Sequence, residues 1–599
     1  MNRTTLARRY APLAVVIAVQ LLLVAVVPST GSHGTAASTL NVGGGGGGST
    51  DLGPGGDNGA TAGTGTGGTG GSGGAVATAA GGATAAGVST SGAGGGSNDS
   101  SNPAVAGDTS HCVNGREFDP AIAYWAPPCV AGTPGAVYRN NGGATYQGVS
   151  ATQITIVDYI TDYGAEVNQI LKAEGLLETY DDAKILDKAF EKFINDHYVL
   201  YGRKVHIVPY QGTCQSVPPD YACLTQEMDH VVDSYKPYMV FWNTTLCSVC
   251  YAELERKQTI AVGGEGFSDD LANQLAPFFY SAGMSSTRME TMFAEFWCNQ
   301  LSSQNNPSRT VKYALHNNPA QDFNGKPRRL GVISTNDKDN EDTVKNVLFK
   351  ELASRCNEPT PNFYFYEQDI NTAAKQVAAG IAALDDPNHP ATSVICLCDP
   401  VAPQFLYNGE QQNNYFPENL LADVQNMGYD STGQNYVGSV TCPNNAQGCE
   451  YDAAFGLVAS SPDRSQGGGE GVKIFNAGGG VGAPPTTGLE TSILAMNWIM
   501  MANLIENSGP NLNPRDMQAK APAMGTTGGG NTGNATLGFK PGSWNWTMDA
   551  RIVYFNKHKP SVYNNANGAY VNASPGRFGP GQFPVLPDVQ NVPTADRRQ

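Results

Sequence analysis

The chain has 599 residues, with 36 basic and 53 acidic side chains and a formal charge of −17 at neutral pH. This acidity argues against a nucleic-acid-binding protein, because affinity for phosphates requires clustered lysine and arginine. No aromatic residue occurs between Tyr10 and Phe118, so that region cannot build a packed core. The remainder is long enough for two lobes or domains.

The chain begins like an exported protein. Three arginines precede an apolar run over residues 13–27, which is typical of a secretory signal. We expect residues 1–31 to be a signal peptide or a retained signal anchor, and the sequence leaves both open. Residues 32–110 are rich in Gly, Ser, Thr and Ala and predict a flexible tether. The expected location is the extracytoplasmic cell envelope, with membrane contact only through residues 1–31.

The twelve cysteines all follow His111, and an exported protein can keep disulfides. The first two lie in an N-terminal extension, residues 111–147. Connectivity cannot be read from sequence, so spacing gives only candidate pairs: Cys112 with Cys129, Cys214 with Cys223, Cys247 with Cys250, Cys298 with Cys356, and Cys442 with Cys449.

From residue 148 short apolar runs alternate with helical patterns, which favours βα units and a parallel sheet. The expected strands and helices follow in chain order: strand 148–160, two helical patterns in 163–195, strand 204–210, helix 220–235, strand 238–242, helix 250–257, and strands 259–262 and 278–282.

A second βα series repeats the first, which predicts two similar lobes. Its elements are helix 287–301, strand 329–334, helix 341–356, strand 362–366, helix 371–384 and strand 393–397, with a later helix 488–506 and strand 551–556. We therefore expect lobe 1 over 148–290, lobe 2 over 291–440, return segments over 441–575 and a Pro-rich tail over 576–599.

Polar side chains follow two of the predicted strands of lobe 1. Thr244, Thr245 and Ser248 come after the strand at 238–242, and Glu265 follows the next strand. In parallel sheets ligands bind at the loops beyond the carboxyl ends of the strands. Short polar side chains at this edge indicate a small polar ligand rather than a lipid.

The order of these elements resembles the type 1 periplasmic binding proteins, specifically the branched-chain amino-acid-binding-like solute receptors. Four segments carry the likeness: 148–156, 259–283, 329–356 and 491–509. The resemblance implies an α/β fold of two Rossmann-like lobes with parallel sheets, joined by hinge crossovers, with the ligand cleft between them. A Tyr–Gly pair often opens the second-lobe helix in that family, and Asn340–Glu341 stands here instead.

The resemblance also implies ligand contacts from both lobes. Carried over by position, they are Thr244, Thr245, Ser248 and Glu265 from lobe 1, and Asp337, Asn340 and Asp399 from lobe 2. Hydroxyl groups and helix N–H groups suit the carboxylate of a zwitterion, and an aspartate suits its ammonium group. The implied role is capture of an amino acid or related compound for the membrane permease of an ABC-type transporter. A surface sensor or adhesin with the same fold remains open.

Two alternatives rest on the cysteines. A Cys-x-x-Cys pair at a helix start, as at Cys247 and Cys250, is where a thioredoxin-like oxidoreductase keeps its redox thiols. With Cys396 and Cys398 the same pair could supply four zinc ligands. Export favours disulfides over both uses. The sequence has no His-Glu-x-x-His, Gly-x-Ser-x-Gly or phosphate-loop motif, so we expect no enzyme, no metal and no cofactor.

Overall fold

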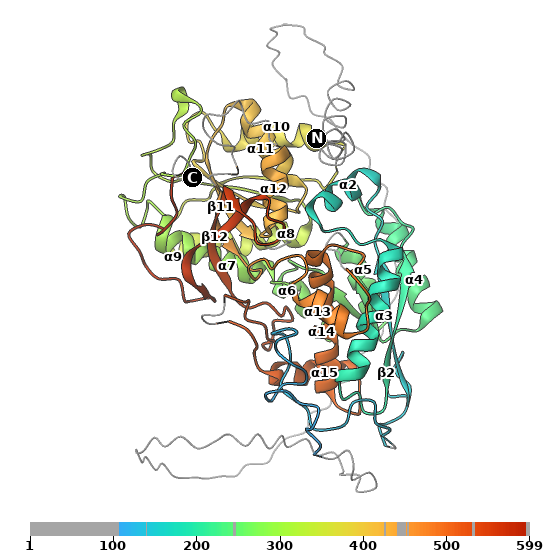
Figure 1. Ribbon diagram of the computed structural model, residues 1–599. Coiled ribbons are helices and arrows are strands. Elements are labelled where there is room, and N and C mark those ends of the chain that lie inside the picture. Colours follow the sequence, from blue (N-terminus) through green and yellow to red (C-terminus); the bar gives the residue numbers. More distant parts are fainter. Residues whose placement is uncertain are drawn as a thin grey trace, which may run out of the picture. The chain divides into compact units, whose positions relative to one another are not determined.

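The structure is a computed structural model (Figure 1) that describes residues 107–138, 140–242, 247–369, 371–423, 427–439, 451, 454–529 and 533–594. The predicted signal segment, nearly all of the predicted tether, and Cys442 and Cys449 lie outside these residues. Within the described ranges, no helix combines the length and apolar character needed to cross a membrane.

The sheet of lobe 1 has five parallel strands in the order β2-β1-β3-β4-β5. Runs of β-branched and aromatic residues form these strands, and both faces are covered, as expected for a parallel sheet. The strands are β1 (Gln153–Ile160), β2 (Lys204–Gln211), β3 (Met239–Trp242), β4 (Ile260–Gly263) and β5 (Phe279–Tyr280).

The helices of lobe 1 come from two distant parts of the sequence. Helix α3 packs against α13 and α14, whereas α4 packs against α5, as right-handed crossovers on both sides of β1 require. The helices are α2 (Ala165–Glu174), α3 (Tyr180–His197), α4 (Tyr221–Tyr235), α5 (Ser248–Arg256), α6 (Asp269–Leu275), α13 (Glu470–Ala477), α14 (Gly488–Ser508) and α15 (Pro514–Lys520), with a 3-10 turn η5 (Ala521–Met524).

The sheet of lobe 2 has seven strands in the order β12-β11-β10-β9-β8-β6-β7. Five of them are parallel and repeat the strand order of lobe 1, and β11 and β12 extend the sheet in antiparallel pairing. The strands are β6 (Leu330–Thr335), β7 (Asn362–Tyr366), β8 (Ser393–Leu397), β9 (Glu418–Asp423), β10 (Phe455–Val458), β11 (Ala550–Pro560) and β12 (Asn567–Phe578).

The helices of lobe 2 also form two groups: α10 packs against α11 and α11 against α12, whereas α7 packs against α9. The helices are α7 (Ser286–Phe296) with its π-helical end η1 (Trp297–Leu301), η2 (Pro319–Gln321), α8 (Lys338–Thr343), η3 (Val344–Leu348), α9 (Phe349–Cys356), α10 (Ala373–Leu384), α11 (Ala402–Asn413) and α12 (Asp430–Ser439). Helix α7 belongs to the core of lobe 2. Lobe 1 therefore ends before α7 begins at Ser286, and not at residue 290 as the sequence suggested. The predicted two-lobed α/β fold with parallel sheets is confirmed.

The described chain passes between the lobes three times, at residues 281–285, 459–469 and 545–549. The first and third segments run side by side, since the Trp546 N–H donates to the Ser281 carbonyl at 2.8 Å. Arg577 connects the second segment to the third, because its guanidinium group donates to the Ser460 carbonyl at 3.0 Å and to Asp549 Oδ1 at 2.7 Å. The crossovers therefore form one connected hinge region.

Five cysteine pairs are joined in the structure, with Cα–Cα distances from 5.1 to 5.9 Å. They are Cys112–Cys129, Cys214–Cys223, Cys247–Cys250, Cys298–Cys356 and Cys396–Cys398. The last pair is one that spacing did not suggest. The zinc alternative is wrong, because its four cysteines are engaged in two disulfides.

The segment after β12 packs on lobe 2. Phe583 is buried in its core beside α7, and the Phe583 N–H donates to Glu295 Oε1 at 2.8 Å. Farther along, Asp588 accepts from the buried guanidinium group of Arg328 at 3.0 Å. Residues 579–594 thus cover one face of lobe 2.

Candidate functional site

A cavity of about 190 Å³ lies between the lobes. Its lining comes from the loop after β1 and helix α2 in lobe 1, and from the ends of β7 and β8 with helices α10 and α11 in lobe 2. In each lobe the strand order reverses beside the first strand, at β1 and at β6. Ligands of open parallel sheets bind at such switch points, beyond the carboxyl ends of the strands.

Lobe 1 contributes Glu265 from the Gly-Gly-Glu-Gly loop after β4. Gly264 and Gly266 have φ angles of 59° and 84°, in the left-handed region that glycine adopts at least cost. Gly283 of the first crossover lies against the Glu265 side chain, because a Cβ atom there would be 2.9 Å from Glu265 Cγ. Glu265, 9% exposed, lines the cavity and a smaller one of about 110 Å³ beside the hinge region.

Lobe 1 also contributes Glu490, from the first turn of α14. Thr487 caps this helix, accepting a hydrogen bond from the Glu490 N–H at 3.1 Å. The side chain of Glu490 lines the cavity although the residue is only 2% exposed. Burial, and then the neighbouring charge of Glu265, raises the pKa of Glu490 to about 8.

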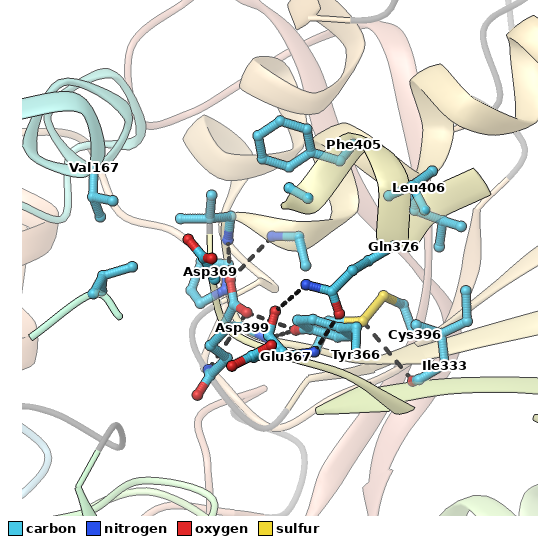
Figure 2. A pocket seen from close by; sticks show the side chains of 18 of the residues that line it. Val167, Ile333, Tyr366, Glu367, Asp369, Gln376, Cys396, Asp399, Phe405 and Leu406 are labelled. Atoms are coloured by element: carbon cyan, nitrogen blue, oxygen red, sulfur yellow. Dashed lines mark hydrogen bonds between the residues drawn. A yellow bond between two sulfur atoms is a disulfide. The ribbon is translucent and has the colours of Figure 1, made fainter. Parts of the chain in front are cut away.

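Lobe 2 contributes Asp399, directly after β8, with Tyr366 from the end of β7 beside it (Figure 2). The Tyr366 hydroxyl donates to Asp399 Oδ2 at 2.6 Å and accepts from the Asp399 N–H at 3.1 Å. Asp399 Oδ1 accepts from the N–H groups of Val401 and Ala402 at the start of α11, at 2.8 and 3.0 Å. Burial, and then the Asp399 charge, raises the pKa of Tyr366. Asp399 is thus held rigidly at the cavity wall.

The rest of the wall is largely apolar and aromatic. Val167 of α2 lines the cavity from lobe 1, and Phe405 and Leu406 of α11 line it from lobe 2 (Figure 2). Tyr163, from the loop after β1, and Tyr364 of β7 also line the cavity. Such walls, with a few polar groups converging on one region, are typical of small-molecule sites.

The lobes contact each other on two sides of the cavity. Glu174 at the end of α2 is fully buried, and its Oε1 accepts from Gln404 Nε2 and Asn435 Nδ2, both at 2.9 Å. Ser268 at the start of α6 donates its N–H to Asp339 Oδ2 at 2.8 Å, and its hydroxyl donates to Asp339 Oδ1. These contacts hold the lobes together around the cavity.

Of the residues that the sequence suggested in lobe 1, Glu265 lines the cavity. Thr244 and Thr245 lie outside the described residues. Ser248 is the first residue of α5 and is not among the residues lining either cavity.

Of the residues that the sequence suggested in lobe 2, Asp399 lines the cavity, and the other two stabilise the start of α8. Asp337 caps that helix by accepting from the Asp339 N–H at 3.0 Å. Asn340 donates to Thr335 Oγ1 at 2.7 Å. The structure therefore brings Glu265 and Asp399 together at one cavity, while Asp337 and Asn340 line neither cavity.

Sequence reasoning missed Glu490, Tyr366 and Phe405. Glu490 is an acid inside a strongly apolar helical segment, a signal that could have found it. Tyr366 is the last residue of a predicted strand, and ligands of parallel sheets bind beyond the carboxyl ends of the strands, so its position could have identified it. Nothing in the local sequence distinguishes Phe405, whose place depends on the packing of α11.

No protein-family model matches the chain, and no curated protein matches it. Among solved structures, a possible leucine/isoleucine/valine-binding protein from Rhodopirellula baltica has 12% identity and a TM-score of 0.43, covering 70% of this chain and 96% of that one. An amino-acid ABC transporter substrate-binding protein from Pseudomonas fluorescens has 9% identity and a TM-score of 0.46, covering 72% and 96%.

An ABC transporter solute-binding protein from R. palustris, in complex with 4-hydroxybenzoate, has 9% identity and a TM-score of 0.45, covering 72% of this chain and 98% of that one. All three are binding proteins. At these identities and TM-scores the likeness says nothing of the role or the ligand of this chain.

Proposed function

We propose that this protein is an exported solute receptor that captures a small organic ligand between its two lobes. The observation that carries the proposal is the cavity at the carboxyl ends of the strands, lined by side chains of both lobes. A ligand that contacts both walls favours the arrangement in which the lobes meet, because its affinity for that arrangement is higher. Amino acids and related compounds are the ligand class that the sequence resemblance suggests.

The closed, liganded form would deliver its ligand to the membrane permease of an ABC-type transporter. The signal-like start of the sequence supports export, and the Gly-rich region after it supports a tether to the cell envelope. A sensor or adhesin of the same fold would bind the ligand equally well. Uptake assays separate the two, because cells that lack a transport receptor lose high-affinity uptake, whereas cells that lack a sensor keep it.

The thiol–disulfide oxidoreductase alternative has little support. Cys247 and Cys250 are joined, and both are completely buried. Exchange requires a partner thiolate to reach one of the two sulfur atoms. The burial of both residues favours a structural staple at the start of α5.

The proposal is tested by thermal unfolding of the protein against amino acids, amines, amides, benzoates and sugars. A ligand at about 100 times its dissociation constant adds about 2.7 kcal/mol to the stability of the folded state. The midpoint temperature of unfolding should rise by several degrees in the presence of that ligand.

Glu265→Gln should reduce this rise, because Glu265 lines the cavity. Glu351→Gln is the matched control, since Glu351 pairs with Arg355 on α9, away from the cavity. No shift with any compound, or equal loss in both variants, would contradict a receptor role.

A further inference from the structure

The acidic side chains that line the larger cavity have no basic counterpart among the described residues of its wall. Among the described residues that line it there is no lysine, arginine or histidine, and five have carboxyl groups: Glu265, Glu367, Asp369, Asp399 and Glu490. Between low-dielectric walls such charges act on a ligand more strongly than they would in water. The cavity therefore attracts cations and disfavours anions.

Glu490 lacks the partners that a buried carboxyl group normally has. The residue is 2% exposed and lines the cavity, yet no hydrogen bond or ion pair engages its carboxyl oxygens within the described part of the chain. Buried polar groups are nearly always hydrogen-bonded, and an unpaired buried charge is costly. A ligand with N–H donors would supply the missing partner.

Further acids lie behind Glu490 in lobe 1. Asp158 on β1 and Asp187 on α3 are 2% and 4% exposed, and burial raises the pKa of both carboxyl groups. Burial, and then the charges of Asp158 and Glu490, raises the pKa of Glu178. Glu178 thus interacts both with Asp158 and with Glu490 at the cavity. These groups therefore hold their protons to a higher pH than ordinary acids. They offer Glu490 no cationic partner, and they add negative charge only as the pH rises.

The remaining wall sets a second requirement for the ligand. Leu171 and Leu176 of the α2 region, Ile333 of β6 and Leu406 of α11 line the cavity with apolar atoms. These surfaces gain by contact with an apolar body of the ligand. Aromatic side chains such as Tyr163 and Phe405 also favour a cation at their faces.

We propose that the ligand of this cavity is an organic cation, a protonated amine or guanidine on an apolar body, without a carboxylate. The inference rests on the proposed receptor function, and it replaces the amino acids suggested by the resemblance with amines or guanidines as the ligand class. Glu490 and Glu265 would accept from the N–H groups, and the apolar wall would hold the body of the ligand. The carboxylate of an amino acid or a benzoate would lie among five acids without a basic partner in the described lining.

A bare metal ion fits the described residues less well. Only one group of three or more potential ligand atoms converges within 4.8 Å among them, namely His111, Cys112 and Cys129. Its cysteines are joined in a disulfide, and none of the three residues lines the cavity. The acids of the cavity are spread along its wall, which suits an extended organic cation.

Calorimetric titration with matched pairs tests this inference. The pairs are 2-phenylethylamine with phenylalanine, tyramine with tyrosine, and agmatine with arginine, whose members differ by the carboxylate alone, and benzoate is included as an anion. We expect at least one amine to bind about tenfold or more tightly than its parent amino acid. If an amino acid or benzoate binds as tightly as the amines, the inference fails while the receptor function stands. If no compound binds, both fail.

Variants locate the effect. Glu490→Gln should reduce the preference for the amine by about tenfold or more, because the charge beside the nitrogen is gone. Glu265→Gln is a second test, because Glu265 is the other acid proposed to accept from the N–H groups of the ligand. Glu351→Gln, outside the cavity, should leave the preference unchanged. Circular dichroism confirms that each variant is folded, and an unchanged preference in both cavity variants would overturn the assignment.

Discussion

Replacing Glu490 by glutamine should make the unliganded protein more stable, and the gain should grow with pH. Glutamine has nearly the same shape as glutamate and does not ionise. The buried carboxyl group has no partner within the described residues to offset its charge. The charged groups that face it are also acids, Glu265 after β4 and Glu178 before α3.

The magnitude follows from the pKa of Glu490, which is about 8 in the folded protein against an ordinary value of 4.5. Between these values the folded state binds more protons than the unfolded chain, so stability falls as pH rises through this range. The loss at this site is about 1 kcal/mol at pH 5, about 3 kcal/mol at pH 7 and about 5 kcal/mol well above pH 8. Below pH 4.5 the loss disappears.

Urea unfolding of the wild type and Glu490→Gln at several pH values measures this loss. The difference in unfolding free energy between the two proteins should widen by about 2 kcal/mol between pH 5 and pH 7. Subtracting the two curves removes the contribution of the acids that do not interact with Glu490, which both proteins share. With Glu351→Gln the difference should stay within about 1 kcal/mol of zero at every pH. A difference for Glu490→Gln that does not change with pH would refute the reasoning.

Two further predictions concern lobe closure and the buried disulfide. Asp339→Ala removes the acceptor of both hydrogen bonds from Ser268 but leaves the cap of α6 in place. The contact between the lobes should then be weaker by about 1–3 kcal/mol. Ligand affinity, measured by calorimetry, should fall about tenfold. An unchanged affinity would show that this contact does not support closure. Cys247 and Cys250 should resist reduction and alkylation in the native protein and become accessible only in denaturant, as mass spectrometry can show, whereas rapid labelling of the native pair would favour redox chemistry.

The repeated βα pattern made the two lobes predictable from sequence, because buried parallel strands read as short, nearly continuous apolar runs. Strands β1 and β6 illustrate this, each being rich in isoleucine or valine and followed by a helical pattern. Strand β12 was missed because it contains Gly, Asn and Pro. Such a sequence is tolerated because β12 lies at the edge of the sheet, where β11 is its one partner among the described strands.

The site was predictable only where it follows the strands. Glu265 and Asp399 come directly after β4 and β8, so the rule for strand ends found them. Glu490 comes from α14, which is more than two hundred residues beyond Glu265 in the chain and reaches the cavity only because the return segment packs on lobe 1. The pairing of Cys396 with Cys398 likewise depends on local backbone geometry that spacing does not reveal.

The most direct test of the central claim is a crystal structure of the protein with the compound that binds most tightly in the titrations. The account predicts that the ligand lies between the lobes, with a nitrogen within about 3 Å of Glu490 or Glu265 and its apolar part against α2 and α11. A ligand bound at any other surface, with this cavity empty, would contradict a receptor that captures its solute between the two lobes.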